Sequence, residues 1–276
     1  MNITEVQAKR SGGWVSLLRS ASAVVGLVLS VGFFLPPFIE WARRYEFVQA
    51  IQFAVFAFWT PVLLAVGAPW ARLGLASNET YEVTAKGERI SPLTLRPFDR
   101  WQLKRSRISG QSRAIFVGCV FGLLAIFWRV APVVDGLVRY PWLMVVEAIS
   151  LVTVGSLLFI DLVESPPIRP GAPRTHRIAI SAILMWAVWV VAYLDGMSHV
   201  SWYHAFHHVA GRGISQAADQ QLSAGSIWFM TAATFLPIIF WNLMHWLQSE
   251  EDPSEELYRL VHEDRVRGFF GTRETK

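Results

Sequence analysis

The sequence predicts an all-α integral membrane protein, a polytopic bundle of six transmembrane helices. Of its 276 residues, 53% are hydrophobic and only 17% are charged, and the mean hydropathy is +0.35. A soluble domain carries about 25% charged residues. Six apolar runs are each long enough for a helix to cross roughly 30 Å of hydrocarbon. They cover residues 14–38, 47–68, 114–134, 141–163, 178–197 and 224–247.

The first run, residues 14–38, has the position of a secretory signal peptide. Its apolar stretch is longer than a typical signal-peptide core, and no convincing cleavage site follows it. We therefore expect a retained helix. All six runs are too long for barrel strands, and only helices or closed barrels satisfy their backbone in lipid. Helices are predicted throughout.

The later runs complete a single bundle, expected over residues 1–247. The third run holds the lone cysteine, Cys119, which we interpret as a small apolar filler because there is no second thiol for a disulfide or a metal. Residues 248–276 are expected to form a cytoplasmic tail. Its DPSEE sequence, starting at Asp252, favours a helix start.

Positive charge is distributed very unevenly between the two sets of loops. The N-terminus, loops 69–113 and 164–177, and the tail hold 19 of the 25 Lys and Arg residues, whereas the opposite loops hold 4. Lys and Arg mark cytoplasmic loops. Both termini should therefore be cytoplasmic, and loop 198–223 should face outward. The basic loops also account for the pI of about 9.5, so no nucleic-acid partner is expected.

Two ionisable residues lie well inside predicted spans. Arg129 is near the end of the third run and Glu147 near the start of the fourth, both about 8 Å from the outer surface at 1.5 Å per residue. Because charges in lipid face a partner or a cavity, we predict that Arg129 and Glu147 pair or share a network. Alternatively, Arg129 snorkels outward and Glu147 is protonated. Asp161, Asp195 and His245 lie close to span ends, where interfacial solvation is expected.

Two segments carry a family resemblance. Residues Gln49 to Pro69 read QAIQFAVFAFWTPVLLAVGAP, and Asp219 to Trp228 read DQQLSAGSIW. Both resemble the CtaG-like cytochrome c oxidase assembly factor family, which has one pattern from His-x-x-Gln-His to Gly-Ala-Pro and another from Asp-Gln through Gly to Trp. The residues that match the first pattern are Gln52, Pro61, Gly67, Ala68 and Pro69. Those that match the second are Asp219, Gln220, Gln221, Gly225 and Trp228.

The family's paired histidines are absent from this chain. A third family pattern, His-x-x-Glu-His followed by Gly, falls on Met144 to Ala148, with Gly155 after it. Four family histidines thus correspond to Gln49, Phe53, Met144 and Ala148. If those histidines hold copper or haem, the resemblance implies the fold and the setting, while the metal site is lost here. Met144 alone could still contact Cu(I) through its thioether.

Histidines gather instead in the segment SHVSWYHAFHH, residues 198–208. The strings HX4H and HX2HH resemble the boxes of membrane di-iron desaturases. Those enzymes resemble one another in having about eight histidines in separate cytoplasmic boxes, whereas these two strings share His204 and face outward. The other histidines, His176, His245 and His262, belong to the opposite face. A di-iron enzyme is therefore not expected.

Copper contact is one interpretation of this segment. If residues 201–211 are helical, His204 and His208 share a face and His207 flanks it, while His199 and Met197 are near in sequence. Imidazoles suit copper. A second interpretation is an interfacial segment, because Trp202, Tyr203 and Phe206 interleave the histidines and aromatic rings favour the headgroup zone. A third is a surface that binds a partner protein.

The leading hypothesis is a non-enzymatic, multi-pass factor of the bacterial plasma membrane. It would assist assembly or transient copper loading of a haem–copper oxidase by binding an oxidase subunit or a copper donor outside the cytoplasm. The alternative is a divergent scaffold or regulatory subunit of the same family without metal binding. A small-solute carrier using Arg129 and Glu147 is a third hypothesis, which no inverted repeat or paired half-helix supports.

Overall fold

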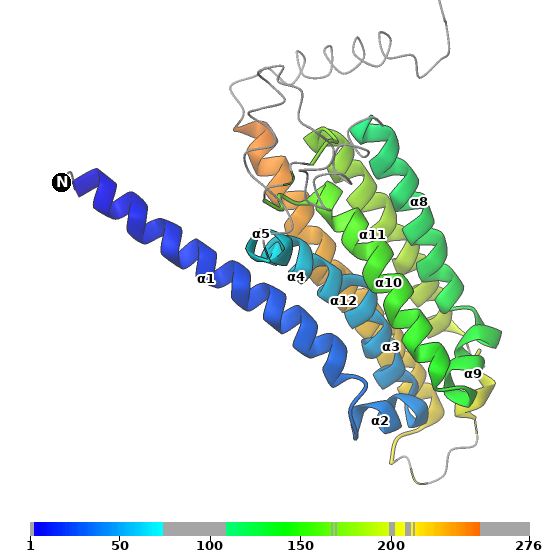
Figure 1. Cartoon of the computed structure of the whole chain (residues 1–276). Coiled ribbons are helices and arrows are strands. Elements are labelled where there is room, and N and C mark those ends of the chain that lie inside the picture. Colours follow the sequence, from blue (N-terminus) through cyan, green and yellow to red (C-terminus); the bar gives the residue numbers. More distant parts are fainter. Residues whose placement is uncertain are drawn as a thin grey trace, which may run out of the picture.

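The protein is a bundle of long helices in a computed structural model that describes residues 3–73, 109–166, 168, 170–198, 202–207, 211 and 213–248 (Figure 1). Throughout these ranges the regular structure is helical, apart from one isolated bridge between Ser165 and Ile168. Five helices there are long and apolar enough to cross a membrane. These are the continuous Glu46–Gly67 helix, α8 (Gly110–Trp128), α10 (Trp142–Leu162), α11 (Arg174–Met197) and α12 (Gln216–Leu247). The all-α membrane fold is thus confirmed, with five candidate spans rather than six.

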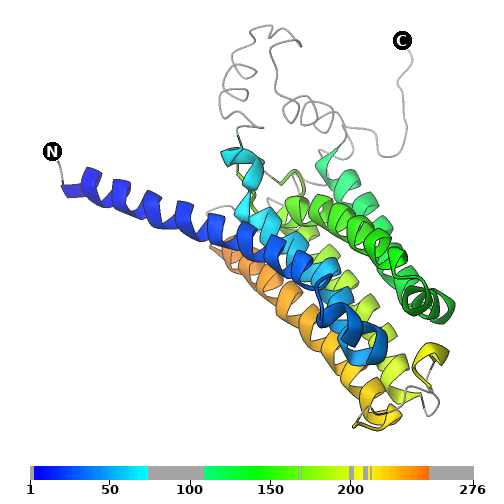
Figure 2. The ribbon, with the colours of Figure 1, turned by 60° about the horizontal axis from the view of Figure 1, so that its bottom comes forward.

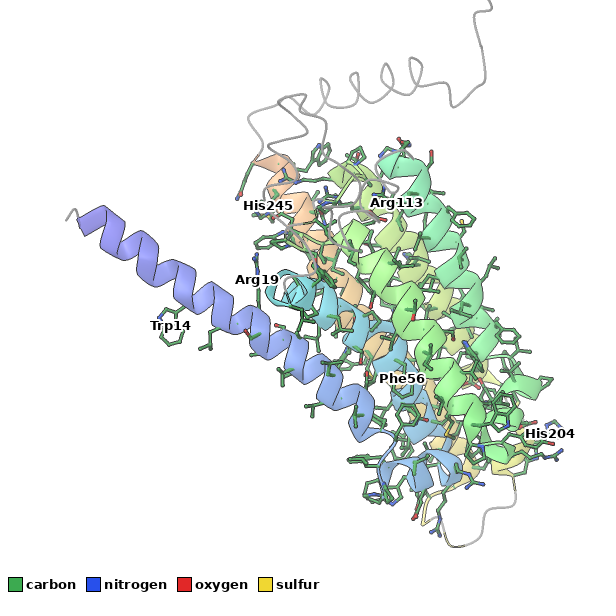
Figure 3. The ribbon with its side chains drawn as sticks, viewed as in Figure 1. Trp14, Arg19, Phe56, Arg113, His204 and His245 are labelled. Carbon is green, nitrogen blue, oxygen red and sulfur yellow. The ribbon has the colours of Figure 1, made fainter. Side chains whose placement is uncertain are left out.

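The predicted first span is the one that the structure does not confirm. Helix α1 (Ile3–Gly32) ends before Pro36, and its apolar part, Leu17–Gly32, is shorter than the five spans. It contacts α4 (Thr60–Gly67), where a Cβ on Gly67 would lie 2.7 Å from Ala23. Beyond this crossing the helix leaves the bundle, so that Trp14 stands 71% exposed (Figures 2 and 3). Short helix α2 (Phe38–Arg44) follows.

The Glu46–Gly67 helix contains a π-helical turn. Helix α3 (Glu46–Ala54) continues through η1 (Val55–Trp59) into α4, and α5 (Pro69–Arg72) follows after a left-handed residue, Ala68, with φ of 45°. Pro61 packs so closely on α10 that a Cβ on Gly155 would lie 2.8 Å from its Cγ. The second and fourth predicted spans are therefore neighbours.

The predicted third span, 114–134, is too long. Helix α8 ends at Trp128, and a separate short helix, α9 (Ala131–Arg139), begins three residues later. The physical reason is Pro132, because proline lacks an N–H and its ring would clash with the carbonyl of Trp128 in a continuous helix. In the first turn of α9 it breaks no hydrogen bond. Arg129 therefore lies at a bend.

The two ends of the bundle differ in their polar groups. Arg113 and His245 lie at one end and His204 at the other (Figure 3). At the Arg113 end, Arg113 forms an ion pair of 2.7 Å with Asp161, which is 1% exposed, so the expectation of an interfacially solvated Asp161 is wrong. A phenylalanine-rich core separates the ends, with edge-to-face contacts that include Phe58 on Phe121. The alternation of loops is as expected, whereas the cytoplasmic placement of the termini stays a prediction.

Candidate functional site

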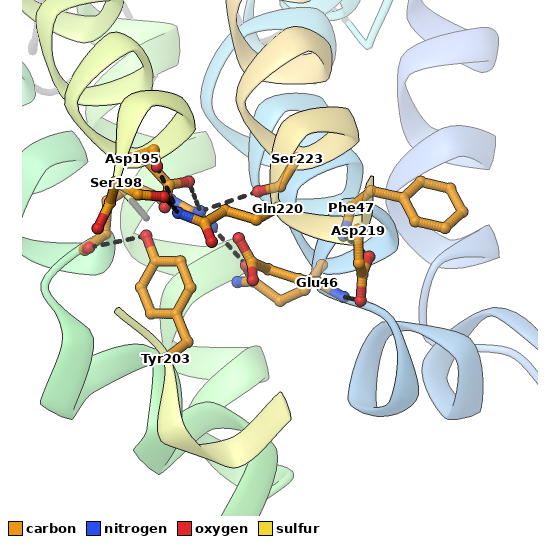
Figure 4. Close-up of polar contacts among 10 residues, drawn as sticks. Glu46, Phe47, Asp195, Ser198, Tyr203, Asp219, Gln220 and Ser223 are labelled. Carbon is orange, nitrogen blue, oxygen red and sulfur yellow. Dashed lines mark hydrogen bonds and ion pairs between the residues drawn. The ribbon is translucent and has the colours of Figure 1, made fainter. Parts of the chain in front are cut away.

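Arg129 is the centre of a buried polar cluster at the His204 end. The cluster also includes Asp195, Tyr203 and Ser223 (Figure 4). The Arg129 side chain is 3% exposed. Nη1 donates to Gln49 Oε1 at 2.5 Å, and Nη2 donates to Ser223 Oγ at 3.4 Å. Nη2 also lies 3.7 Å from Asp195 Oδ2. The guanidinium thus joins α3, α11 and α12 to the bend after α8.

Two aromatic rings complete the surroundings of the guanidinium. Its central carbon lies 4.9 Å from the ring centroid of Tyr203 and 5.7 Å from that of Phe53. These distances allow cation–π attraction, which is stronger away from water. The Tyr203 hydroxyl donates to the backbone carbonyl of Arg129 at 3.2 Å. Burial raises the pKa of the Tyr203 phenol, so the hydroxyl keeps the proton that it donates.

Acidic side chains outnumber cations in this cluster. Glu46 and Glu147 are completely buried, and Asp195 is 1% exposed. The carboxylate oxygens of Glu46 and Glu147 have no hydrogen-bond partner within the described part of the chain. Arg129 and Glu147 lie within electrostatic range, but the carboxylate in ion-pair distance is that of Asp195. The expectation that Asp195 is solvated at the interface is therefore wrong.

Asp219 and Gln220 of α12 form hydrogen bonds with the backbone at the ends of two neighbouring helices, α3 and α11. Asp219 accepts the backbone N–H groups of Glu46 and Phe47, each at 3.0 Å, and so caps α3. A carboxylate is favourable there because a helix N-terminus carries partial positive charge. Gln220 Nε2 donates to the carbonyl of Asp195 at 2.5 Å and to that of Ser198 at 3.3 Å, at the end of α11 (Figure 4).

Helix α12 begins with a serine cap, ahead of the predicted sixth span. The cap is Ser215, whose hydroxyl accepts from the Ala218 N–H at 3.2 Å. Asp219 lies within the first turn of α12 and caps α3 instead. Helix α12 therefore begins earlier than the predicted residue 224, because its first two turns are polar and sequence hydropathy does not detect them.

The histidine segment is less helical than the copper interpretation requires. Only η2 (His204–Phe206), a single 3₁₀ turn, forms between residues 202 and 207. The rings of His204 and His207 stack with centroids 5.1 Å apart. Asp135 accepts the N–H of Ala205 at 2.8 Å, and its other carboxylate oxygen lies 3.9 Å from His204 Nδ1. The segment is thereby fixed to α9.

The aromatic residues of this segment point into the protein. Tyr203 and Phe206 are completely buried and pack on Val134 of α9. The expectation that these rings rest in the headgroup zone is therefore wrong for both. Met197 is 59% exposed, while His199 and His208 lie outside the described residues. Within the described ranges, no group of three His, Cys, Asp or Glu side chains is arranged to hold a metal ion.

A family model described as cytochrome c oxidase caa3 assembly factor (Caa3_CtaG) matches residues 3–249. The chain belongs to this family. No curated protein and no solved structure matches it. The resemblance inferred from the sequence is therefore confirmed over nearly the whole chain, and the five apolar helices agree with a multi-pass membrane protein of the Caa3_CtaG family.

The residues that match the family patterns have two kinds of environment. The larger group packs helices together. Gln52 Nε2 donates to the carbonyl of Phe33 at 3.2 Å. This group also includes Pro61, Gly67, Asp219 and Gln220. Pro69 begins α5, directly after the left-handed Ala68. Gln221, Gly225 and Trp228 instead point out of the bundle.

Sequence reasoning missed several members of the Arg129 cluster. Glu46 lies just outside the predicted second span, although its position directly before an apolar run is a signal that it begins the helix. Ser223 gave no signal in the sequence. The Ala131–Pro132 pair did carry a signal for the bend, because proline favours the first turn of a new helix.

Proposed function

We propose that this Caa3_CtaG protein assists assembly of a haem–copper cytochrome c oxidase in the bacterial plasma membrane, without catalysing a reaction. It would act by binding an oxidase subunit or a copper donor at the extracytoplasmic face. The observation that carries the proposal is the family match together with the elaborate polar cluster at the His204 end of the bundle. The small number of Lys and Arg residues in the loops of that end supports its extracytoplasmic placement.

The residues at the family's histidine positions do not fit a metal ion. Phe53 and Ala148 have no ligand atom, and the side-chain oxygen of Gln49 accepts a hydrogen bond from the guanidinium of Arg129. Met144 is completely buried. Arg129 therefore brings a permanent positive charge to the neighbourhood where the resemblance implies a metal cation.

A fixed positive charge in place of a metal cation indicates that Arg129 organises the polar contacts within the bundle. It supports the second candidate function, a scaffold or regulatory subunit that keeps the family fold without metal binding in the bundle. Any copper would then be cargo handled outside the bundle, by His204 and His207 together with His199, His208 or Met197. Imidazole and thioether groups suit copper.

Oxidase content in a deletion strain tests the assembly function. We expect a strain that lacks the gene to lose oxidase activity and oxidase copper, and the wild-type chain to restore both. A deletion strain with normal oxidase activity and copper content would remove the assembly proposal.

Copper binding separates the two candidates. The purified chain is supplied with Cu(I), and bound copper is counted for the wild type and for a variant with His204, His207 and His208 all changed to Ala. Stoichiometric copper that disappears in the triple variant supports copper loading. His245→Ala, at the opposite end, is the matched control. Absence of bound copper in every sample would favour the scaffold.

A further inference from the structure

Helices α11 and α12 present an aromatic cluster to the membrane. Trp189 and Trp228 stack with ring centroids 4.5 Å apart, and Trp186 lies edge-on to Trp189 at 5.5 Å. Trp186 is 60% exposed and Trp228 is 50% exposed. Gln221 and Gly225 share this exposed side of α12, seven and three residues before Trp228. We refer to Trp186, Trp189, Gln221, Gly225 and Trp228 as the docking face.

The tryptophans of this face lie deep in the bundle. Trp186 is twelve residues from the start of α11 and eleven from its end, so at 1.5 Å per residue it is about 16–18 Å from either end. A hydrocarbon core is about 30 Å thick, which places the Trp186 indole near the midplane. Tryptophan normally prefers the membrane interface, where its N–H meets polar groups.

Lipid gives these indoles no hydrogen-bond acceptor. The Trp189 N–H donates to the backbone carbonyl of Trp228 at 3.1 Å and is satisfied. The indole N–H groups of Trp186 and Trp228 have no such bond to any described residue. Acyl chains at this depth are pure hydrocarbon, so a polar group left there loses its hydrogen bond to water without replacement.

Gly225 packs against no other helix in the described part of the chain. A Cβ added there meets nothing within 4 Å, in contrast to Gly155 and Gly67, whose hydrogen faces a neighbouring helix at close range. Glycine within a helix is unfavourable relative to alanine. In membranes, small residues on an exposed helix surface allow a second helix to approach closely. The empty space at Gly225 lies beside the tryptophan cluster, on the same helix.

We infer that the docking face binds a transmembrane helix of the oxidase that this protein helps to assemble. Lipid can cover an apolar surface, but it cannot accept hydrogen bonds from the two indole N–H groups, and it does not need the space that a glycine leaves. A transmembrane helix can accept both hydrogen bonds through hydroxyl or exposed carbonyl oxygens. It can also pack closely against Gly225. The inference rests on the proposed function, because an assembly factor for a membrane oxidase must meet that oxidase within the membrane.

The test places a bulky side chain at Gly225, on the docking face. Gly225→Leu is expected to fold normally, because a Cβ at this position meets no atom of the described residues within 4 Å. The matched control is Cys119→Leu, at an exposed position of α8. Each tagged variant is expressed in the deletion strain, and the oxidase membrane subunits that co-purify with it are measured together with oxidase activity.

We expect Gly225→Leu to retain roughly a tenth of the co-purifying oxidase subunit, since overpacking a tight helix contact lowers affinity on the order of tenfold. Cys119→Leu should equal the wild type. Trp186→Phe keeps the ring but removes the N–H, and should show a smaller loss. This second variant serves as the test if Gly225→Leu unfolds.

Two results would overturn the inference. The docking face is not used if the Gly225→Leu and Trp186→Phe proteins both bind the oxidase subunit and support oxidase activity like the wild type. The second result comes from cross-linking at Gly225→Cys in a Cys119→Ser background. If only a second copy of this chain is captured, the partner of the docking face is this chain and not the oxidase. A deletion strain with normal oxidase would instead refute the proposed function itself.

Discussion

Replacing Arg129 by methionine removes the only cation that the described residues contribute to the buried cluster, while keeping a side chain of similar length. Asp195, 3.7 Å away, loses its counter-charge, and Gln49 Oε1 loses its donor. Breaking a buried ion pair by removing one partner costs about 3–5 kcal/mol. A carboxyl that takes up a proton recovers part of this cost, whereas the unsatisfied amide adds about 1–3 kcal/mol.

These terms together give an expected loss of about 4 kcal/mol in the free energy of unfolding for Arg129→Met. For a chain of this size that corresponds to a decrease in Tm of roughly 8–16 °C. Thermal unfolding in detergent, followed by the fluorescence of the tryptophans, measures it. Arg139→Met is the control, because Arg139 is exposed at the end of α9 and its loss should change stability by no more than about 0.5 kcal/mol.

A double variant distinguishes the ion pair from general packing. Arg129→Met combined with Asp195→Asn removes both charges, so it should recover about 1–2 kcal/mol relative to Arg129→Met alone. If Arg129→Met unfolds within about 1 kcal/mol of the wild type, the guanidinium is not organising the cluster. If adding Asp195→Asn to Arg129→Met does not raise the free energy of unfolding, the ion pair between Arg129 and Asp195 is not the source of the stability.

Two further substitutions test the helix contacts around the site. Asp219→Ala should lower stability by about 1–2 kcal/mol, because the first two N–H groups of α3 lose their acceptors, whereas Asp219→Asn should cost less; equal thermal stability of all three proteins would contradict the capping role. Gly155→Ala should destabilise the bundle by about 1–3 kcal/mol, because its Cβ would lie 2.8 Å from Pro61. Gly225→Ala should raise the free energy of unfolding by up to about 1 kcal/mol. If Gly155→Ala and Gly225→Ala proteins have the same thermal stability, the close packing of α10 on α4 is refuted.

The resemblance and the spans were predictable because both depend on local sequence. The second, fourth, fifth and sixth predicted spans each correspond to one long helix, since hydropathy summed over about 20 residues decides insertion. The third prediction extends too far at its end, because Pro132 lies in the first turn of a new helix. The first is not confirmed as a span, because the apolar part of α1, Leu17–Gly32, is shorter than the five candidate spans.

The contacts of the site were less predictable, because they join residues that are far apart in the chain. Arg129 and Glu147 are both recognisable as charges within apolar runs, but nothing in the sequence distinguishes Asp195 from Glu147 as the ion-pair partner of Arg129. The choice depends on how α10 and α11 are rotated about their axes. For the same reason the sequence does not show that Asp219 of α12 caps the start of α3.

By itself, the sequence determined that this chain enters a membrane as helices, that its charge distribution separates two faces, and that it belongs with the Caa3_CtaG proteins. These properties follow from side-chain type at each position and its neighbours. Only the tertiary structure decided that a guanidinium meets the side chains at two former histidine positions, that Tyr203 turns inward beneath it, and that Gly225 faces empty space. Those facts depend on distances between helices, which packing fixes only when the whole bundle is assembled.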